Sequence, residues 1–324
     1  MLKLVKAQGQ GIVSDKGRWG YQYQGVPVGG VLDEFSFAVG NLALGNPENA
    51  ACLELMGQFD FVCGKPCQVF LANRGAQALL NNKPVLGGRV LKLQEGDLLR
   101  TKPPWLGFWN MLCVQGGVNV PLVMGSRSTC LPAGFGGYLG RALQVGDEIH
   151  AGDKFTATLV SEVRLGLPTA SLDPTKCLQV RCLAGPEFDA LTEESKQVFV
   201  SQAFMLGQQS SRMAYRLESA GSVLSMKHPL SLRSNAVHPG MVQLPPSGQP
   251  IVLLSDAQVT GGYPRIASVL ASELWKFAHL GGGQGVHWVL VDAAQATRLQ
   301  LQHEQETRRY HHAIESNNSE NYVD

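Results

Sequence analysis

The chain has 324 residues, of which 16% are charged and 44% hydrophobic, and its formal net charge at pH 7 is +1. This length exceeds one ordinary domain and suggests two. A nearly neutral chain has no basic field for a nucleic-acid backbone or an anionic membrane surface. The sequence therefore favours a small-molecule substrate and predicts neither a nucleic-acid nor a membrane partner.

The seven cysteines cannot all pair, and most lie inside apolar runs, which indicates reduced thiols in a core. Cys63 and Cys67 have C-x₃-C spacing, but no second Cys or His pair at zinc-finger spacing accompanies them, so no metal site is predicted. The opening MLKLVKAQGQG is too soon interrupted for a signal peptide, and no run of 18 apolar residues exists. These features predict a cytoplasmic protein.

In chain order, the first clear pattern is a helix with Asp33 as its N-cap. Apolar residues recur at helical spacing from Phe35 to Leu42, and Gly45 follows the end. Short apolar runs separated by Gly-Asp and Pro-Gly turns then predict strands: CQVFLAN (67–73), RVLKL (89–93), DLLRT (97–101), PIVLL (250–254) and HWVLVD (287–292).

Two further helices are predicted near the end of the chain. One begins at Pro264 and ends before Gly281, and the other runs from Asp292 as N-cap through Arg308. The polar segment 315–324 reads as a loosely held tail. Many strands with an occasional capping helix predict a mainly β fold of closed barrels or sandwiches.

The chain contains an internal repeat. Val114-Gln115, Pro121–Met124, Ser126, Gly136–Tyr138 and Ala142 reappear in order as Val242-Gln243, Pro250–Leu253, Ser255, Gly261–Tyr263 and Ala267, and Arg18–Tyr21 is echoed by Arg212–Tyr215. Two domains of one fold explain this repeat. We expect a first domain at 1–165 with an insertion around 59–100, a second at 178–298, a C-terminal helix and tail at 299–324, and a join within 163–177.

The repeated Gly-Gly-Tyr corner raises the possibility of a binding site. If Pro264 begins a helix, Gly261 and Gly262 abut its N-terminus, where free amides and the helix dipole would hold a carboxylate or a phosphate. The alternative is that the glycines only permit a positive φ in a tight turn. The second occurrence, at Gly136 and Gly137, favours binding.

Arginines beside glycines and aromatics are further candidates for holding an anion: Arg18, Arg127, Arg141, Arg212, Arg216 and Arg265. Pairing with an acid inside the fold explains each of them equally well. Asp15 and Asp33 carry the same ambiguity, although helix capping alone explains Asp33. Asp256 could orient a ligand amide or bond to its own turn.

Long ordered motifs between about Leu4 and Ala294 resemble one family: SDKGRWGYQYQGVPVGGVLD, ALGNPENAACLEL, GGVNVPLVMGSRST, GGYLGRALQVGD, SSRMAYRL and GMVQLPPSGQPIVLLSDAQVTGGYPRIASV. They are similar to the family of 5-oxoprolinase C-type subunits, also described as the biotin-dependent carboxyltransferase or KipA family. That family is related to part of the carboxyltransferase region of urea carboxylase. The resemblance implies two tandem cyclophilin-like β-barrel domains with a few short helices.

The resemblance also implies a hydrolase that is active only in a complex with two partners, a B-type subunit of the KipI kind, and an A-type subunit of the LamB/YcsF kind. The complex hydrolyses 5-oxo-L-proline to L-glutamate with ATP, and magnesium accompanies the ATP. No tightly bound cofactor is expected in this chain. A lactam resists water because of amide resonance, and phosphorylation of its oxygen would remove that resonance.

The motif positions imply a site shared with the B-type partner. Its catalytic residues would be Arg212, Arg127 and Asp256, and its substrate- or nucleotide-binding residues Arg18, Ser126, Gly136, Gly137, Arg141, Gln243, Gly261, Gly262, Tyr263 and Arg265. Two alternatives stay open. One is a biotin-dependent carboxyltransferase component acting on urea-like amides, and the other is a KipA-type regulatory binding protein.

The chain departs from the family pattern at four positions: Ser14 and His279, where glutamine is usual, and Ser211 and Ala214, where aspartate and glycine are usual. The loss of aspartate at Ser211 indicates either an altered substrate or a lost structural pair. Ala214 would be strained if its position required a positive φ.

Overall fold

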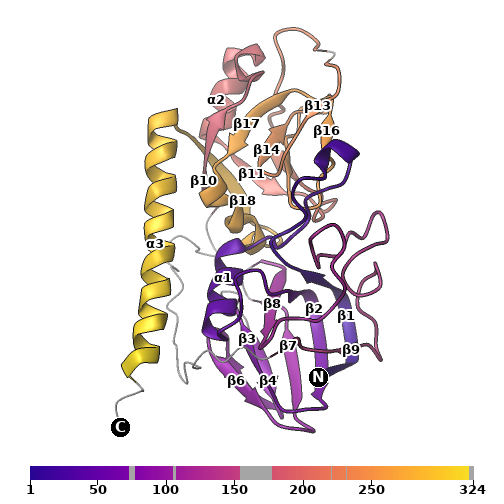
Figure 1. The fold of residues 1–324 in the computed structure, drawn as a ribbon. Coiled ribbons are helices and arrows are strands. Elements are labelled where there is room, and N and C mark those ends of the chain that lie inside the picture. The colour runs from indigo at the N-terminus through magenta and orange to yellow at the C-terminus, as the bar shows by residue number, and fades with distance from the viewer. Residues whose placement is uncertain (73–76, 105–106, 154–176, 220, 231, 321–324) are drawn as a thin grey trace. The chain divides into compact units, whose positions relative to one another are not determined.

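The computed structural model describes residues 1–72, 77–104, 107–153, 177–219, 221–230 and 232–320 (Figure 1). The chain divides into two compact units. The first comprises Met1–Arg18, Gly29–Thr169 and Gln305–Asp324, and the second comprises Trp19–Val28 and Ala170–Glu304. The predicted join at 163–177 lies outside the described residues except for Cys177.

The first unit is a nine-stranded sheet with the order β5-β4-β7-β2-β8-β3-β6, to which β1 adds by pairing with β2 and β9. Its strands are β1 (Leu2–Ser14), β2 (Cys52–Cys63), β3 (Cys67–Leu71), β4 (Gln77–Leu80), β5 (Lys83–Leu86), β6 (Val90–Leu93), β7 (Leu98–Lys102), β8 (Trp109–Val114) and β9 (Glu148–Ile149). Among the described residues this sheet does not close on itself.

The antiparallel pair of β1 and β2 forms the long seam of this sheet, from Leu2 opposite Cys63 to Ser14 opposite Cys52. Gly9 and Gly57 face each other midway, with φ of 140° and 111°. A side chain on either glycine would run into a backbone carbonyl of the other strand, so only glycine fits here.

Helix α1 (Glu34–Ala43) packs against β3 and β8 and begins as predicted. Asp33 Oδ1 accepts a hydrogen bond from Ser36 N at 2.9 Å, which satisfies one of the free amides of the first turn. The buried face of α1 packs into an apolar cluster with Phe70 and Cys113. Gly40 lets the helix approach the sheet, since a Cβ there would lie 2.6 Å from Cys113 Sγ.

The second unit is a closed barrel with the strand order β10-β17-β14-β15-β12-β11-β18. Its strands are β10 (Leu178–Ala184), β11 (Ala203–Leu206), β12 (Ala214–Ser219), β14 (Met241–Gln243), β15 (Ile251–Leu253), β17 (Arg265–Val269) and β18 (Gly285–Leu290), with β13 (Asn235–Ala236) and β16 (Thr260–Gly261) forming a separate pair. A parallel pair, β10 with β18, closes the barrel. The mainly β fold predicted from the sequence is confirmed.

Aromatic side chains pack around the barrel. The ring of Phe199, from α2 (Glu193–Ser201), stacks on Trp288 of β18 with centroids 5.4 Å apart. Tyr215 of β12 meets Phe277 edge to face at 6.2 Å. Contacts of this kind add roughly 0.5–1.5 kcal/mol beyond area burial. Helix α2 was not predicted from the sequence, although Thr192 caps it by accepting a hydrogen bond from Ser195 N.

The helix predicted from Pro264 is wrong over its first part. Arg265–Val269 is strand β17, paired with β10 and β14, and only Ala271–His279 is helical, as the 3₁₀ helix η3. A proline is tolerated just before a strand as well as at the start of a helix. Sheet pairing on both sides of β17 overrides the apolar spacing that suggested a helix.

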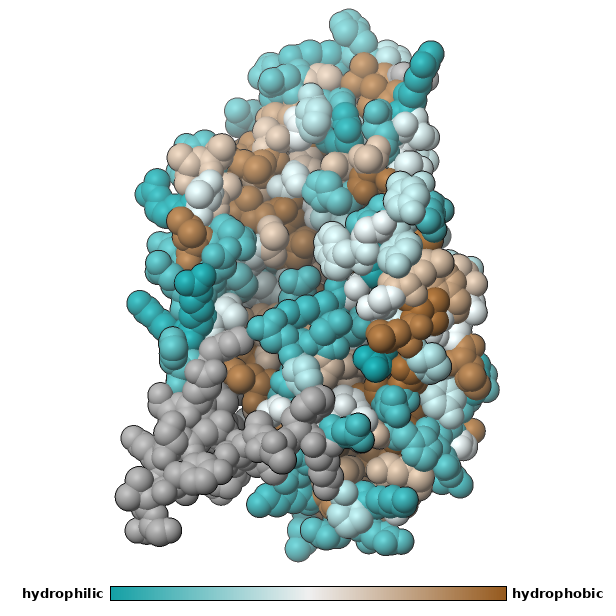
Figure 2. Space-filling view, viewed as in Figure 1, coloured by the Kyte–Doolittle hydropathy of each residue, from teal (hydrophilic) through white to brown (hydrophobic). Residues whose placement is uncertain are grey.

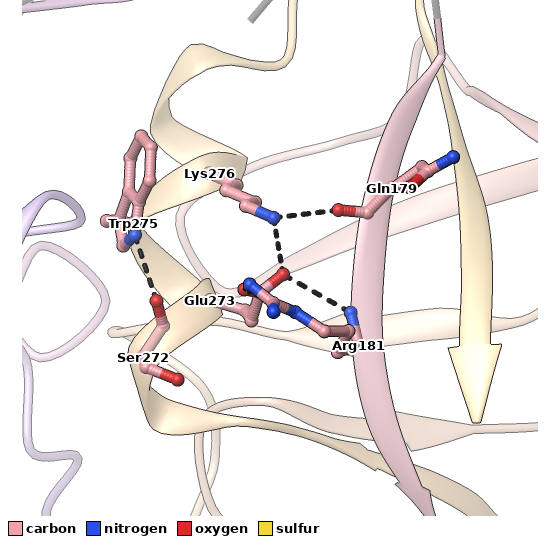
Figure 3. A network of polar contacts seen from close by, with 6 residues as sticks. All are labelled: Gln179, Arg181, Ser272, Glu273, Trp275 and Lys276. Carbon is pink, nitrogen blue, oxygen red and sulfur yellow. Dashed lines mark hydrogen bonds and ion pairs between the residues drawn. The ribbon is translucent and has the colours of Figure 1, made fainter. Parts of the chain in front are cut away.

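The helix η3 is long for a 3₁₀ helix, and buried charges bind it to β10 (Figure 3). The Glu273 carboxylate accepts from Arg181 of β10 and from Lys276 Nζ at 2.5 Å. Lys276 Nζ also donates to the carbonyl of Gln179 at 2.8 Å. Glu273 and Lys276 are both buried, so each charge depends on the others for its hydrogen bonds.

The remaining helices are short 3₁₀ turns, η1 (Gln22–Gln24) and η2 (Phe188–Ala190), and the long α3 (Ala293–Glu320). Asp292 caps α3 as predicted, through a reciprocal pair of hydrogen bonds with Gln295. The helix runs to Glu320, beyond the predicted end at Arg308, so the expected tail is helical over most of its length. Over the described residues, none of the helices combines the length and apolar character needed to span a bilayer.

Candidate functional site

In the first unit, Asp15 binds the segment that contains Ser126 and Arg127. The buried Asp15 carboxylate accepts from Ser126 Oγ, Ser128 Oγ and Arg127 N, each at 2.6 Å, and from Gly17 N at 2.9 Å. The first three of these hydrogen bonds hold the turn after β1 against a segment more than a hundred residues later. Ser126, predicted to bind a ligand, is therefore already committed to Asp15.

The second unit also has a buried aspartate that binds a distant turn, but its partner is an arginine side chain. Arg212 Nε donates to Asp256 Oδ2 at 2.9 Å, and Arg212 Nη2 to Asp256 Oδ1 at 3.4 Å. Both side chains are buried, with 4% and 7% of their area exposed. The structure thus brings together two residues predicted to be catalytic, and it pairs them with each other.

Arg18 is buried in the first unit. Its Nε donates to the carbonyl of Val123 at 3.0 Å and its Nη2 to that of Ser128 at 2.8 Å, while the guanidinium lies 4.8 Å from the centre of the Phe135 ring. Gly136, with φ of 70°, lies against it, since a Cβ there would be 2.8 Å from Arg18 Nη2. Arg18 and Gly136, both predicted to bind a ligand, therefore pack against each other, and each has a structural role in the fold.

Arg141 and Arg265 are paired with acids. Arg141 binds both oxygens of Asp147 at 2.8 Å, and its guanidinium lies over the Tyr138 ring. Partial burial works to raise the pKa of Asp147, but the hydrogen bonds from Arg141 and from Gln144 N outweigh it and hold that pKa below its usual value. The Arg141 pKa is raised by the same pair.

Arg265 binds Glu187, with Nη2 to Oε1 at 2.8 Å and Nε to Oε2 at 3.0 Å. Hydrogen bonds from the Arg265 side chain lower the pKa of Glu187 and raise that of Arg265. In both pairs the shifts in pKa favour the ionised carboxylate and the charged guanidinium, which is typical of structural ion pairs.

Arg127 differs from these arginines because it lines an open cavity of about 480 Å³ in the first unit. Its Nε donates to the carbonyl of Val120 at 3.0 Å. Within the part of the chain that the structure describes, no hydrogen bond or ion pair engages its two terminal nitrogens. The rest of the lining mixes polar residues and glycines, including Asn49, Asn119, Gly116, Gly117, Gly125 and Asp153, with apolar residues such as Val118 and Leu122. A guanidinium at such a cavity suits a carboxylate or a phosphate.

A second cavity of about 490 Å³ shares Val118 and Asn119 with the first. The first Gly-Gly-Tyr corner forms one wall through Gly137 and Tyr138. His150 and Glu148 line it too, with His150 Nε2 3.9 Å from Glu148 Oε2. Asn119, Glu148 and His150 were not predicted from the sequence, because single polar residues outside a repeated motif give no sign that they lie close together in the fold.

The second Gly-Gly-Tyr corner, in the other unit, corrects the helix-terminus hypothesis. It joins β16 to β17, so no helix N-terminus follows Gly262. Neither Gly261 nor Gly262 has a positive φ, whereas Gly137 in the first copy has φ of 53°. Gly261 is needed instead for close packing, since a Cβ there would lie 2.6 Å from Gln243 Nε2. Tyr263 at this corner is 45% exposed.

Gln243, at the end of β14, is fully buried beneath this corner. Among the described residues, neither its amide oxygen nor its amide nitrogen has a hydrogen-bond partner. A buried polar group left without a partner costs roughly 1–3 kcal/mol. A protein rarely retains such a cost without a bound water or a ligand to satisfy it, so Gln243 remains a predicted ligand-binding residue in the second unit.

Two of the departures from the family pattern have simple local explanations. Ala214 lies in strand β12 and does not have a positive φ, so the expected strain is absent. Ser211 Oγ accepts from Met213 N at 3.2 Å, which is the turn-forming bond that an aspartate also makes. Neither departure disturbs the Arg212–Asp256 pair.

Exposed apolar side chains border the two cavities of the first unit. Leu122 and Leu139, which line them, are 56% and 79% exposed, and Met124 is 38% exposed. Met124 and Leu139 have φ of 51° and 55°, a left-handed conformation that is costly for such residues. Figure 2 shows that apolar side chains on the visible face of the protein occur in patches among polar ones.

Comparison with known proteins places these features in a family. Residues 24–290 match the carboxyltransferase domain, subdomains A and B. The chain is 36% identical to the C-type subunit of 5-oxoprolinase from Escherichia coli K12 over 315 residues, 96% of each chain, and 31% identical to that of Haemophilus influenzae over 94% of this chain and 96% of the other.

Longer proteins share the same region. The urea amidolyase of Lachancea kluyveri is 27% identical over 87% of this chain but only 16% of its own length. The crystal structure of the Kluyveromyces lactis urea amidolyase superposes with a TM-score of 0.84 at 22% identity, over 95% of this chain and 20% of that one. A structure of TTHA0988 superposes with a TM-score of 0.73 at 28% identity, over 89% of this chain and 56% of that one. The chain belongs to the carboxyltransferase domain family, subdomains A and B, whose members include the bacterial 5-oxoprolinase C-type subunits.

Proposed function

We propose that this protein is the C-type subunit of an ATP-dependent 5-oxoprolinase that hydrolyses 5-oxo-L-proline to L-glutamate. The observation that carries the proposal is 36% identity to the C-type subunit of a 5-oxoprolinase over 96% of both chains. In this proposal the chain works in a hetero-oligomer with two other subunits, one B-type and KipI-like, the other A-type and LamB/YcsF-like. The chain alone is inert.

The chemistry requires activation of a stable amide. Transfer of the γ-phosphoryl group of ATP to the lactam oxygen ends the amide resonance and gives the ring carbon a leaving group. One water adds at that carbon and the C–N bond breaks, which leaves the γ-phosphate ester of glutamate, an acyl phosphate. A second water hydrolyses this acyl phosphate, so that glutamate, phosphate and ADP leave. Magnesium bound with ATP supplies charge neutralisation at the phosphates. The protein must hold a small carboxylate and stabilise charge on oxygen.

Among the described residues, Arg127 is the one best placed to hold such an anion. It lines a cavity of about 480 Å³, and its terminal nitrogens have no partner among the described residues. Gln243 is proposed to hydrogen-bond an amide group of the ligand in the second unit, because its own amide is buried and unsatisfied among the described residues. Arg212 and Asp256 are proposed to act as positioning residues for their turns, since each already has the other as a partner.

Co-purification with A-type and B-type subunits, followed by assay of ADP release with and without 5-oxoproline, tests the proposal. We expect ADP release only with all three proteins and 5-oxoproline present. Arg127→Gln should reduce kcat/KM for 5-oxoproline by about 10²-fold, the effect of losing one charged hydrogen-bonding group. Arg298→Gln, on the exposed surface of α3, is the matched control and should leave it unchanged. ADP release that is independent of 5-oxoproline would contradict the proposal.

A second function is favoured by the match to the carboxyltransferase domain and by the urea amidolyase relatives. In that function the chain would transfer a carboxyl group from a biotin carrier to a urea-like amide. A separate protein would have to supply the biotin. Carboxylation of urea when a biotin carboxylase and its carrier are added, without any 5-oxoproline-dependent ADP release, would favour this alternative.

A further inference from the structure

Two cysteines of the first unit face each other across a short loop. Cys63 ends β2, Cys67 begins β3, and their Sγ atoms are 3.9 Å apart. This distance is a van der Waals contact between two thiols, so rotation about the side chains brings the sulfurs towards bonding distance. The pair is not part of the cavities that contain Arg127 or Tyr138.

The surroundings of the two thiols are unequal. Cys63 is 1% exposed, and its thiol donates to the carbonyl of Lys65 at 3.0 Å. Cys67 is 8% exposed and lines a cavity of about 140 Å³ together with Gln68 and Lys92. That cavity can admit a molecule the size of hydrogen peroxide, since a water occupies about 30 Å³ in the liquid. A small oxidant therefore reaches Cys67 before Cys63.

The chain provides two internal comparisons. Cys52 and Cys113 also contact each other, but both are completely buried beneath α1. Burial, followed by the contact with Cys113, raises the pKa of Cys52 well above its usual value, which suppresses the reactive thiolate. Cys177 has the opposite properties, because it is partly exposed and makes no contact with another cysteine among the described residues.

We propose that Cys63 and Cys67 are an oxidation-sensitive dithiol that closes to an intrachain disulfide. The Cys67 thiolate attacks one oxygen of hydrogen peroxide, which forms a sulfenic acid and releases hydroxide. The Cys63 sulfur then attacks the sulfenic sulfur and displaces the oxygen as water. The two thiols lose two electrons and two protons, and the peroxide is reduced to two waters.

The bond would fix the corner where β2 meets β3. Gly64 N, in the loop between the cysteines, donates to the carbonyl of Met1 at 3.0 Å, and Gly96 N donates to the carbonyl of Cys63 at 2.7 Å. The disulfide therefore constrains a corner that already connects the start of β1 to the turn before β7. The inference does not depend on the proposed 5-oxoprolinase activity.

The test treats the full-length reduced protein with increasing concentrations of hydrogen peroxide, unfolds it in urea, alkylates the remaining thiols, and maps the peptides by mass spectrometry without reductant. The peptide carrying Cys63 and Cys67 should lose two hydrogens and resist alkylation. Hydrogen peroxide should oxidise these two thiols at least about tenfold faster than Cys52 and Cys113, measured as the rate at which each thiol stops reacting with the alkylating agent. Cys177 should form only single-thiol oxidation products.

Variants separate the steps. After peroxide treatment, the Cys63→Ser variant should contain oxidised Cys67 but no disulfide. The Cys67→Ser variant should keep Cys63 reduced. The Cys52→Ser variant, as the control, should still form the Cys63–Cys67 disulfide. If a serine variant fails to fold, as judged by circular dichroism, mapping of the wild type alone decides. The proposal is overturned if both thiols stay alkylatable at peroxide concentrations that oxidise Cys177, or if either one pairs with a different cysteine.

Discussion

Arg212 and Asp256 are 44 residues apart in the sequence, yet Arg212 Nε and Asp256 Oδ2 lie 2.9 Å apart with both side chains buried. Asp256 N also donates to the Arg212 carbonyl at 3.1 Å. The pair ties the turn before β12 to the turn after β15. Asp15 does the same in the first unit through Ser126 and Ser128, so in both units a buried carboxylate connects turns that are distant in the sequence.

Removal of one partner of the Arg212–Asp256 pair should destabilise the protein strongly. Arg212→Leu leaves a buried carboxylate without its cation and should cost about 3–5 kcal/mol of unfolding free energy. The double variant with Asp256→Leu should cost clearly less than the sum of the single variants. Urea unfolding followed by fluorescence measures these values. Lys3→Ala breaks the exposed pair with Glu148 and serves as the control with no measurable effect.

Gly261→Ala should destabilise the second unit because the new Cβ would lie 2.6 Å from Gln243 Nε2. We expect a loss of about 1–3 kcal/mol, typical of overpacking. Gly262→Ala is the matched control, since the nearest atom to its Cβ would be the Leu232 carbonyl oxygen at 3.2 Å. Adding Gln243→Ala should restore part of the stability lost in Gly261→Ala. Equal melting temperatures for the two alanine variants would contradict this account.

Gln243→Leu should separate stability from activity. The substitution replaces a buried amide that has no partner among the described residues with an apolar side chain of similar size, so the isolated chain should gain about 1–2 kcal/mol. If Gln243 binds the ligand, KM for 5-oxoproline in the assembled complex should rise while the KM for ATP stays constant. A stabilised chain with unchanged KM values would remove Gln243 from the site.

Leu139→Gly should raise stability slightly despite the loss of a large side chain. Leu139 is 79% exposed with φ of 55°, so glycine removes a left-handed strain of about 1 kcal/mol at little packing cost. Leu122→Gly, at an exposed position without a positive φ, should give no such gain. Differential scanning calorimetry of both variants decides, and a lower melting temperature for Leu139→Gly than for Leu122→Gly would refute the strain argument.

The Arg141–Asp147 pair predicts a specific loss of stability in acid. The pKa of Asp147 is lower in the folded state than in the unfolded state, so the folded state gains stability from its ionisation above the unfolded pKa of about 3.9. This contribution is lost as the pH falls from that value through the lower folded pKa. Asp147→Asn should therefore flatten the dependence of the unfolding free energy on pH in this acid window, and an unchanged slope would contradict the pair's role.

Sequence patterns predicted the parts of the fold that depend on local chemistry. Asp33 and Asp292 cap their helices through side-chain bonds to nearby amides, and such bonds need only residues within one turn. Pro264 was misleading because a proline is compatible with the start of both a helix and a strand, and the choice depends on β10 and β14, which are distant in the sequence.

The candidate site was less predictable for the same physical reason. Six arginines looked equivalent in the sequence, and only the partners supplied by the fold distinguish Arg127 from the paired Arg141 and Arg265. The two Gly-Gly-Tyr corners looked alike, yet one needs a positive φ and the other needs room for a buried amide. The repeat indicated that glycine is needed at both corners, but it did not show which physical requirement the glycine meets at each.

The parallel pairing of β10 with β18 has a mechanical consequence. The first and last strands of the barrel run side by side, with Leu178 opposite Val286 and Cys182 opposite Leu290, so the chain enters at one rim and leaves at the other. Tension applied between the two ends of the barrel would load all the hydrogen bonds of this pair in shear at once, instead of peeling them apart singly.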